Sequence, residues 1–343
     1  MRVRELAERL GATFEGDGEK DLRGAASVED AGGDELAFIG SRKAARQFEA
    51  SAAGCLIVPF DLPNPGGRTM IRAAEPRLAF ARAIALLYPA APPEPGIHPT
   101  AVIAAGAEIA PGATIGPHVS IGDETRIGAN VRIGAGCAIG RRGRLGCNCL
   151  LHARVTIYDD VEIGDNVVLH SGCVIGADGF GFVLTGERYE KFQQIGRVVI
   201  EDDVEIGANS CVDRAALGVT FIGQGTKLDN LVHVAHNCRL GRHVVVAAQT
   251  GFSGSVVVED YAVIGGQVGI GDKARIGSRA VLGSKCGILS SKVVRPGQVL
   301  WGIPARPLKE HLEQLASLAR LPAMRRELAE LKRRLQEIVE RGS

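Results

Sequence analysis

Aliphatic side chains recur at every sixth position through much of this chain. The first series has fourteen members without a break: Ile97, Ile103, Ile109, Ile115, Ile121, Ile127, Ile133, Ile139, Leu145, Leu151, Ile157, Ile163, Leu169 and Ile175. Glycine commonly follows the aliphatic residue, and a small or β-branched residue usually stands two positions before it. This hexapeptide repeat is typical of a parallel β-helix, in which each six-residue unit forms one short face of a triangular coil.

The repeat is interrupted twice. Its phase is lost after Ile175 and resumes at Ile200, which predicts a loop over about 177–197. The phase of the repeat shifts a second time, by four residues, near 214–221. Thirteen further hexads then run in register from Ile222 to Val294. At three hexads per coil, the repeats predict about ten triangular coils.

Two segments with other patterns flank the repeats. The first 95 residues end in a proline-rich linker and read as a small α/β domain, with helices over 3–10 and 77–88 and a buried strand over 54–58. We place the β-helix at residues 96–303 and a C-terminal helical extension at 304–343. Its helical pattern begins at Leu308, is expected to break at Pro322, and resumes as a seam from Met324 to Ile338. The fold class is therefore mainly β, with appended helices.

Composition narrows the possible functions. The formal net charge is +1, which gives no global electrostatic case for binding nucleic acid or an anionic membrane. Neither a secretory signal nor an apolar run of membrane-spanning length is visible. The eight cysteines show neither a zinc-ligand spacing nor a disulfide framework, and five fall on the small-residue position of the repeat. We therefore expect a cytoplasmic protein without a transmembrane segment and without a metal.

Two stretches depart from the repeat and are candidates for chemistry. One is the loop 176–182, Gly-Ala-Asp-Gly-Phe-Gly-Phe, and the other is the polar stretch 228–238, which contains His233, His236 and Asn237. Here the chain resembles the UDP-3-O-acylglucosamine N-acyltransferases, which add a 3-hydroxyacyl chain to the 2-amino group of that sugar nucleotide. The matching segments span nearly the whole chain: 76–81, 176–182, 196–209, 212–217, 228–241, 249–255, 264–269 and 302–305.

The resemblance implies a fold and a set of roles. The β-helix would be left-handed and the protein a homotrimer, with His236 as the general base that takes a proton from the attacking amine. Residues eighteen apart stack on successive coils, so Gly254 lies over His236, and in the family a backbone N–H at this position is the oxyanion donor. Asp229, seven residues before His236, is a candidate to support the ring. Substrate contacts are expected from Asp178, Gly179, Phe180, Asn237, Lys43 and Gly287.

Two departures from the family pattern bear on these roles. Lys273 stands where members often have a second histidine, so an assisting role for that histidine does not transfer. In the N-terminal domain, which in the family contributes to uridine binding, Lys43 is kept. Ala44, however, replaces an aromatic residue that could stack on uracil. The contacts to the nucleotide are therefore open.

The implied partners are UDP-3-O-acylglucosamine and an acyl carrier protein. The phosphopantetheine arrives on that carrier, so no cofactor of the chain's own is expected. A locally basic C-terminal helix, with Arg325, Arg326, Lys332, Arg333 and Arg334, suits an acidic carrier. The alternatives are other hexapeptide acyltransferases: a sugar O-acyltransferase, or a sugar N-acetyltransferase that uses coenzyme A. His152 and His170 also stack by the eighteen-residue rule, for which we favour a polar stack over a metal site.

Gly287 leads to an expectation about the acyl chain. A chain that starts near His236 and runs toward the C-terminal end of the β-helix must pass this residue. Glycine has no side chain to close a groove, so we expect the groove to continue past it.

Overall fold

The computed structural model describes residues 1–40, 49–89 and 94–341. It divides into two compact units, one ending at Pro92 and the other beginning at Pro93. Lys43 and Ala44 lie outside the described residues, so the nucleotide contacts expected from them stay predictions.

The first unit is a small α/β domain. Its five-stranded sheet has the order β1-β5-β4-β3-β2, with parallel pairing except between β1 and β5. The strands are β1 (Thr13–Glu15), β2 (Gly24–Ala25), β3 (Glu35–Phe38), β4 (Cys55–Val58) and β5 (Met70–Arg72), and the helices are α1 (Val3–Leu10) and α3 (Pro76–Leu87). The fully buried β4 and both helices confirm the elements that the sequence predicted.

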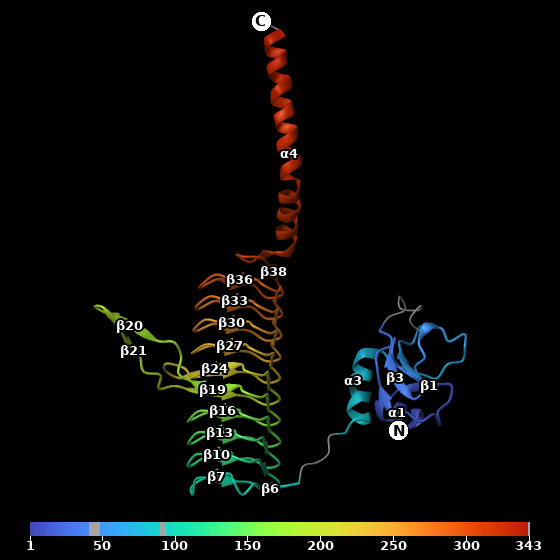
Figure 1. Cartoon of the computed structure of the whole chain (residues 1–343), viewed down its shortest axis with the longest axis vertical. Coiled ribbons are helices and arrows are strands. Elements are labelled where there is room, and N and C mark those ends of the chain that lie inside the picture. Colours follow the sequence, from blue (N-terminus) through green and yellow to red (C-terminus); the bar gives the residue numbers. More distant parts are fainter. Residues whose placement is uncertain (41–48, 90–93, 342–343) are drawn as a thin grey trace. The chain divides into compact units, whose positions relative to one another are not determined.

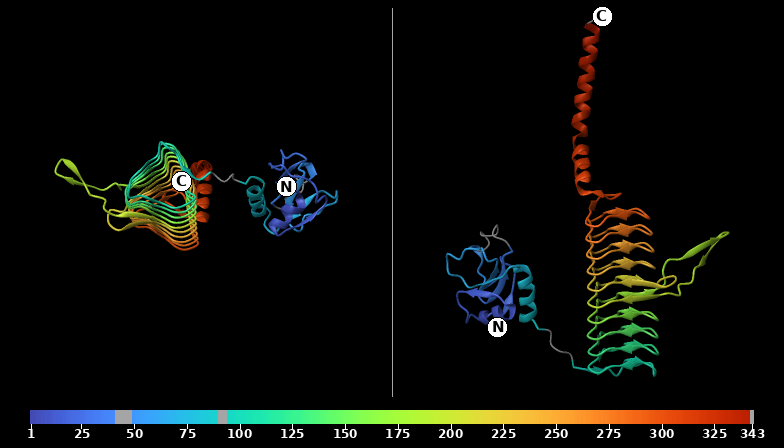
Figure 2. Two further views of the ribbon diagram at one scale, coloured as in Figure 1. Left: turned by 90° about the horizontal axis from the view of Figure 1, so that it is seen from below. Right: turned by 180° about the vertical axis from the view of Figure 1, so that it is seen from behind.

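The second unit is the predicted left-handed parallel β-helix (Figures 1 and 2). Every aliphatic hexad residue from Ile115 to Val294 points inward, into one continuous core. The outer corners are closed by residues with positive φ, among them Asn130, Asn148 and Asn166 at 57–58°. Asparagine tolerates this left-handed conformation better than most residues, which allows the tight turn at each corner. The inward aliphatic residues and the corner residues together shape the coil.

Three sheets form the faces of the triangle. The site sheet consists of β7 (Val102–Ile103), β10 (Ser120–Ile121), β13 (Ala138–Ile139), β16 (Thr156–Ile157), β19 (Val174–Ala177), β24 (Cys211–Asp213), β27 (His233–Val234), β30 (Gly251–Phe252), β33 (Gly269–Ile270) and β36 (Gly287–Ile288). The second sheet consists of β8 (Glu108–Ile109), β11 (Arg126–Ile127), β14 (Arg144–Leu145), β17 (Glu162–Ile163), β22 (Arg197–Ile200), β25 (Val219–Ile222), β28 (Arg239–Leu240), β31 (Val257–Val258), β34 (Arg275–Ile276) and β37 (Val293–Val294).

The third sheet consists of β6 (Gly96–Ile97), β9 (Thr114–Ile115), β12 (Arg132–Ile133), β15 (Leu150–Leu151), β18 (Val168–Leu169), β23 (Glu205–Ile206), β26 (Lys227–Leu228), β29 (Val245–Val246), β32 (Val263–Ile264), β35 (Val281–Leu282), β38 (Val299–Trp301) and β39 (Arg306–Pro307). Only β39 is antiparallel, and it turns the chain back at the end of the β-helix.

Both predicted interruptions are present. The first is a hairpin of β20 (Phe182–Thr185) and β21 (Arg188–Lys191), which projects far from the β-helix in Figure 2. The second is the loop 214–218 between β24 and β25. It makes the pairing between β24 and β27 join residues twenty-two apart, as Cys211 with His233, rather than eighteen.

The C-terminal segment is one helix, α4 (Leu308–Arg341), that runs through Pro322. The break predicted at Pro322 is therefore wrong. Proline removes one N–H, which leaves a single carbonyl of the preceding turn without its helical partner, and on this exposed helix water can satisfy that group. Within the described part of the chain, no helix is both long enough and apolar enough to cross a membrane.

Candidate active site

His236 lies in a slot between two glycines. It occupies the turn after β27, at the corner between the site sheet and the second sheet. A Cβ atom built on Gly254 would stand 2.6 Å from Cε1 and 2.7 Å from Nε2 of the imidazole. One built on Gly179 would stand 2.6 Å from Cβ and 3.0 Å from Cδ2 of the same residue. Glycine at both positions therefore lets backbone approach the ring from two sides.

Asn237 fixes the tautomer of His236. The Asn237 Oδ1 accepts a hydrogen bond from the Ala216 N–H at 3.1 Å, and its Nδ2 donates to the Leu217 carbonyl at 2.8 Å. These bonds identify Oδ1 as the atom that lies 3.1 Å from His236 Nδ1. An oxygen acceptor there requires Nδ1 to carry the proton, so the lone pair of Nε2 is free to accept one.

The N–H of Gly254 differs from those of several equivalent corners. In the turns at Arg141, Cys147 and Arg242, the backbone N–H donates to an aspartate one coil further on, at 2.6–2.8 Å. Asp272 occupies the corresponding place above Gly254. Among the residues that the structure describes, however, neither it nor any other acceptor takes the Gly254 N–H. This donor is available to a ligand beside His236.

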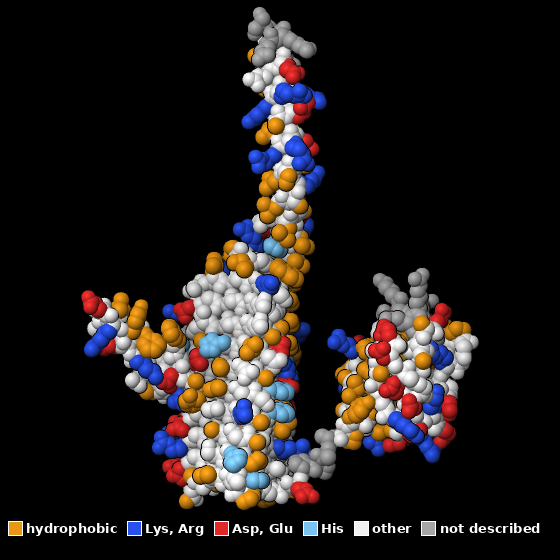
Figure 3. Space-filling model, viewed as in Figure 1, with side chains coloured by type: hydrophobic (Ala, Val, Ile, Leu, Met, Phe, Trp, Pro, Cys, Tyr) orange, Lys and Arg blue, Asp and Glu red, His pale blue; other side chains and the backbone are white. Residues whose placement is uncertain are grey.

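A cavity of about 670 Å³ adjoins the two histidines of this stretch. Its floor is the outer face of the site sheet, where glycine stands at the outward position of three successive strands: Gly251, Gly269 and Gly287. A Cβ atom on either of the first two would meet no atom within 4 Å. Figure 3 shows this surface, over β30, β33 and β36, almost bare of charged and apolar side chains. The missing side chains leave a shallow groove along the β-helix.

The groove does not stay open past Gly287. Three carbon atoms of the Ile303 side chain lie 3.2–3.7 Å from the place of a Cβ on Gly287. The expectation that the groove continues beyond this residue is therefore wrong. A residue that follows β38 folds back over the end of the site sheet, which hexad arithmetic alone does not reveal.

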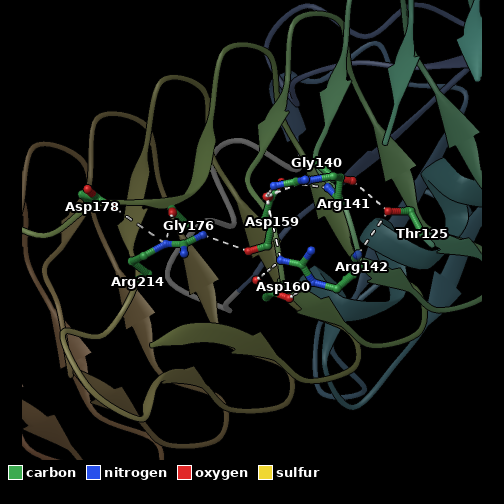
Figure 4. Close-up of polar contacts among 10 residues, drawn as sticks. Thr125, Gly140, Arg141, Arg142, Asp159, Asp160, Gly176, Asp178 and Arg214 are labelled. Atoms are coloured by element: carbon green, nitrogen blue, oxygen red, sulfur yellow. Dashed lines mark hydrogen bonds and ion pairs between the residues drawn. The ribbon is translucent and has the colours of Figure 1, made fainter. Parts of the chain in front are cut away.

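The loop beside His236 is held by a largely buried arginine whose side chain is 13% exposed. Arg214 donates from Nε to the Gly176 carbonyl and from Nη2 to the Asp159 carbonyl, each at 2.8 Å (Figure 4). Its Nε also lies 3.9 Å from Asp178, and Lys191 of the hairpin pairs with the same carboxylate. Asp178, expected to bind substrate, thus anchors the base of the hairpin.

Two other loop residues, Gly179 and Phe180, lie beside His236 and the cavity, and their expected contacts with substrate stay predictions. Phe180 borders the cavity with 86% of its surface exposed. Gln194 lies buried behind Gly179, and within the described chain its Oε1 has no hydrogen-bond partner. A Cβ on Gly179 would stand 2.9 Å from that oxygen. The loop therefore leaves no room for a side chain at this glycine.

The structure does not bring Asp229 to His236. The Asp229 carboxylate accepts the N–H of Asn230 at 2.7 Å and that of Ala248 at 3.0 Å, and so closes the corner before β27. The seven residues from Asp229 to His236 extend beyond one face of the triangular coil, so the two side chains lie at different corners. The expected supporting role of Asp229 is therefore wrong.

Another carboxyl, which the sequence analysis did not single out, lies beside His233. Asp213 at the end of β24 has a side chain only 8% exposed, and its Oδ2 lies 3.5 Å from His233 Nε2. Burial raises the pKa of Asp213 to about 7. The proximity of His236 opposes this shift and that of Asp178 adds to it. Burial also lowers the pKa of His233. The alternation of β24 could have indicated an outward Asp213, but not its neighbours.

His152 and His170, which lie away from this site, form a polar stack. The rings of His152 and His170 lie 4.9 Å apart and nearly parallel, and His170 Nε2 lies 2.9 Å from a Glu205 carboxylate oxygen. In the part of the chain that the structure describes, no three side chains of metal-binding type are grouped to hold an ion.

Comparison with known proteins identifies related sequences over most of the chain. Residues 19–86 match the profile of UDP-3-O-(3-hydroxymyristoyl) glucosamine N-acyltransferase. Residues 142–177 match the bacterial transferase hexapeptide, and residues 118–143 and 197–230 match the hexapeptide repeat of succinyl-transferase. The small α/β unit and the β-helix thus each match a profile of their own.

Two relatives that match nearly the whole chain are named as UDP-3-O-acylglucosamine N-acyltransferases. A UDP-3-O-acylglucosamine N-acyltransferase from Anaeromyxobacter sp. (strain K) is 46% identical over 97% of this chain and 96% of its own length. A protein of that name from Gloeobacter violaceus is 48% identical over 99% and 98%. Among solved structures, the Arabidopsis UDP-N-acetylglucosamine acyltransferase has a TM-score of 0.56 at 24% identity, over 63% of this chain and 75% of its own. That likeness concerns the fold alone.

Proposed function

This chain belongs to the UDP-3-O-acylglucosamine N-acyltransferase family, whose step lies in lipid A biosynthesis, and we propose how its site performs the transfer. A 3-hydroxyacyl chain moves from the thioester of an acyl carrier protein to the 2-amino group of UDP-3-O-(3-hydroxyacyl)glucosamine. The observation that carries the proposal is the slot around His236, where a ring with a free Nε2 faces a bare groove.

His236 acts as the general base. The lone pair of the amine attacks the thioester carbonyl, and the nitrogen must lose a proton as the tetrahedral centre forms. The Nε2 of His236 takes that proton, because in the neutral ring the hydrogen bond from Nδ1 to Asn237 leaves the lone pair on Nε2. Asn237 thus acts through the base rather than on the substrate.

Gly254 stabilises the negative charge on oxygen. As the tetrahedral centre forms, the carbonyl electron pair moves onto oxygen, and the Gly254 N–H beside His236 donates to it. When the C–S bond breaks, the electron pair leaves with sulfur. The imidazolium of His236 returns the proton to that thiolate, so the base is restored and the carrier leaves as a free thiol.

The transferred acyl chain lies along the glycine groove. Gly251 and Gly269 give it backbone to lie against, and Gly287 with Ile303 marks its far end. Phe180 covers the entrance from the side of the loop. A groove that is lined by glycine and ends at an isoleucine fits a chain of limited length better than a short acetyl group.

The donor docks as a protein. The phosphopantetheine is part of the acyl carrier protein, so the enzyme needs no cofactor of its own. The basic residues of α4 suit an acidic carrier, although Arg333 and Arg334 are already paired with Glu330. All eight cysteines are free thiols, which supports a reducing cytoplasm as the site of the reaction.

The active enzyme is a homotrimer, with each groove completed by a neighbouring copy. The projecting hairpin supports this arrangement, because it carries apolar side chains that one chain leaves exposed, among them Val183, Leu184 and Tyr189. The uridine of the acceptor binds the N-terminal domain, and Lys43 is proposed to contact it.

A product assay tests the proposal. Purified enzyme is given 3-hydroxyacyl carrier protein and UDP-3-O-(3-hydroxyacyl)glucosamine, and mass spectrometry follows the appearance of an amide-linked second chain. Acylation of a free hydroxyl on UDP-N-acetylglucosamine would instead identify a sugar O-acyltransferase. Amide formation from acetyl coenzyme A alone would identify a small-donor N-acetyltransferase.

A further inference from the structure

We propose that Asp213 is a positioning residue of this site: its buried carboxyl holds the His233 ring and balances the positive charge that His236 acquires with the amine proton. The inference rests on the proposed function, because it presumes that His236 takes a proton during transfer. It adds a group that the family resemblance did not supply.

Asp213 ends the strand next to β27, which carries His233 and is followed by His236. Strand β24 lies between β19 and β27, with Asp213 paired to Ala177 and Cys211 paired to His233. Since Val212 points into the core, Asp213 points outward on the same face as His233. Its carboxyl is 3.5 Å from His233 Nε2 and is also within electrostatic reach of His236.

The hydrogen bonding of Asp213 differs from that of the structural carboxylates in this β-helix. Asp159 accepts the Arg141 N–H and binds its guanidinium, and Asp229 accepts two backbone N–H groups. Among the described residues, the contact found for the Asp213 carboxyl is the imidazole of His233. A buried carboxyl without backbone donors is costly when charged, so its presence needs a reason other than closing a turn.

The charges around Asp213 come from every neighbouring element. On the β19 side is Asp178, whose charge is already balanced by Lys191 and Arg214. On the β27 side are His233 and, in the following turn, His236. The thiols of Cys211 and Cys238 complete the set, and burial raises the pKa of both. The two imidazoles are therefore the groups that can supply a positive charge to this carboxyl.

Asp213 can respond to the charge of its neighbours. With a pKa of about 7, Asp213 is poised between its neutral and charged forms at neutral pH. When His236 becomes positive, the ionised carboxyl, itself only 8% exposed, stabilises it with little screening by water. His233, whose ring borders the cavity, is held in place by the same carboxyl and borders the path of the substrate.

The test compares Asp213→Asn with Asp203→Asn, a matched loss of one carboxylate at an exposed corner of the same β-helix, where the carboxylate accepts hydrogen bonds from side-chain amides. Thioester cleavage is followed by thiol release from pH 5.5 to 9, a readout that does not depend on the identity of the acceptor. We expect Asp213→Asn to lower kcat by about 10- to 100-fold with both KM values nearly unchanged, since general-base catalysis contributes about 10²–10⁴-fold and a positioning residue accounts for part of it. Asp203→Asn should keep wild-type turnover.

The pH profile separates positioning from mere structure. Burial raises the pKa of Asp213 to about 7, so wild-type kcat/KM should fall as the pH drops through this value and the carboxylate takes up a proton. Asp213→Asn has no such group, so this acid limb should be lost or move to lower pH. If Asp213→Asn lowered kcat but left the acid limb of kcat/KM where it is in the wild type, the proposal would be overturned. Wild-type turnover in this variant would overturn it as well. If wild-type enzyme releases thiol but makes no N-acylated sugar nucleotide, the proposed function fails while the comparison of variants still decides the role of Asp213.

Discussion

Gly254 lies one coil beyond His236, so close that a Cβ atom on the glycine would stand 2.6 Å from Cε1 of the imidazole. The ring must shift if any side chain is added there, because this separation is shorter than real Cβ contacts allow. The same glycine offers the N–H that we assign to the oxyanion. Base and oxyanion donor are thus held together by the eighteen-residue repeat itself.

His236→Ala should fold normally and lose most acyl transfer, because the change removes a proton acceptor and no atom of the hydrophobic core. The loss of a general base typically lowers the rate by about 10²–10⁴-fold. Steady-state kinetics and thermal melts check both halves of this prediction. Near wild-type turnover with an unchanged melting temperature would remove His236 from the mechanism.

Gly254→Ala should lower kcat by about 10²-fold, because displacing a catalytic group by roughly 1 Å is enough for such a loss. Gly96→Ala is the matched control, since a Cβ at that strand position on the β-helix meets no atom within 4 Å. It should leave turnover unchanged. If both variants were as active as the wild type, the close approach of the Gly254 backbone to His236 would not be needed for catalysis.

Asn237→Gly tests the tautomer. Glycine tolerates the positive φ of 61° at this position but cannot accept the hydrogen bond from His236 Nδ1. We expect kcat to fall by about 10- to 100-fold, within the contribution of an oriented general base. Asn237→Asp keeps an oxygen for Nδ1 and should retain more activity than the glycine variant. The reverse order would contradict the role given to Oδ1.

The sequence predicted this site wherever the hexad arithmetic holds. Gly254 follows from His236 by adding eighteen, and the parallel β-helix follows from the aliphatic repeat. Asp229 was misplaced because seven residues carry the chain past a corner. Asp213 was missed because the loop 214–218 inserts four residues, so that β24 and β27 pair at a separation of twenty-two. Gly179 and Ile303 approach the groove from outside the repeat, where no periodicity applies.

Sedimentation should report three chains of 36.1 kDa in the active enzyme. The physical reason is that a single chain leaves the cavity beside His236 and the apolar hairpin open to solvent. Apolar surface of this kind is stabilised by contact with another copy. A stable monomer with full activity would contradict the proposed inter-subunit groove.

Gly287 and Ile303 should set the length of the acyl chain. The Ile303 side chain already lies 3.2 Å from the place of a Cβ on Gly287, so Gly287→Met must either displace it or fill the last part of the groove. Each methylene that can no longer be buried costs about 0.8 kcal/mol, which shifts the preference between donors several-fold. Gly287→Met should therefore favour shorter 3-hydroxyacyl donors. Ile303→Ala, which removes the closing side chain, should favour longer ones.

A series of carrier-bound donors that differ by two carbons measures kcat/KM for both variants and the wild type. Neither change touches His236, so turnover of the donors that still fit should stay near that of the wild type. Opposite shifts in the two profiles would place the end of the acyl chain between these residues. Identical profiles would mean that the chain leaves the β-helix before β36 and that Ile303 closes a groove the substrate does not reach.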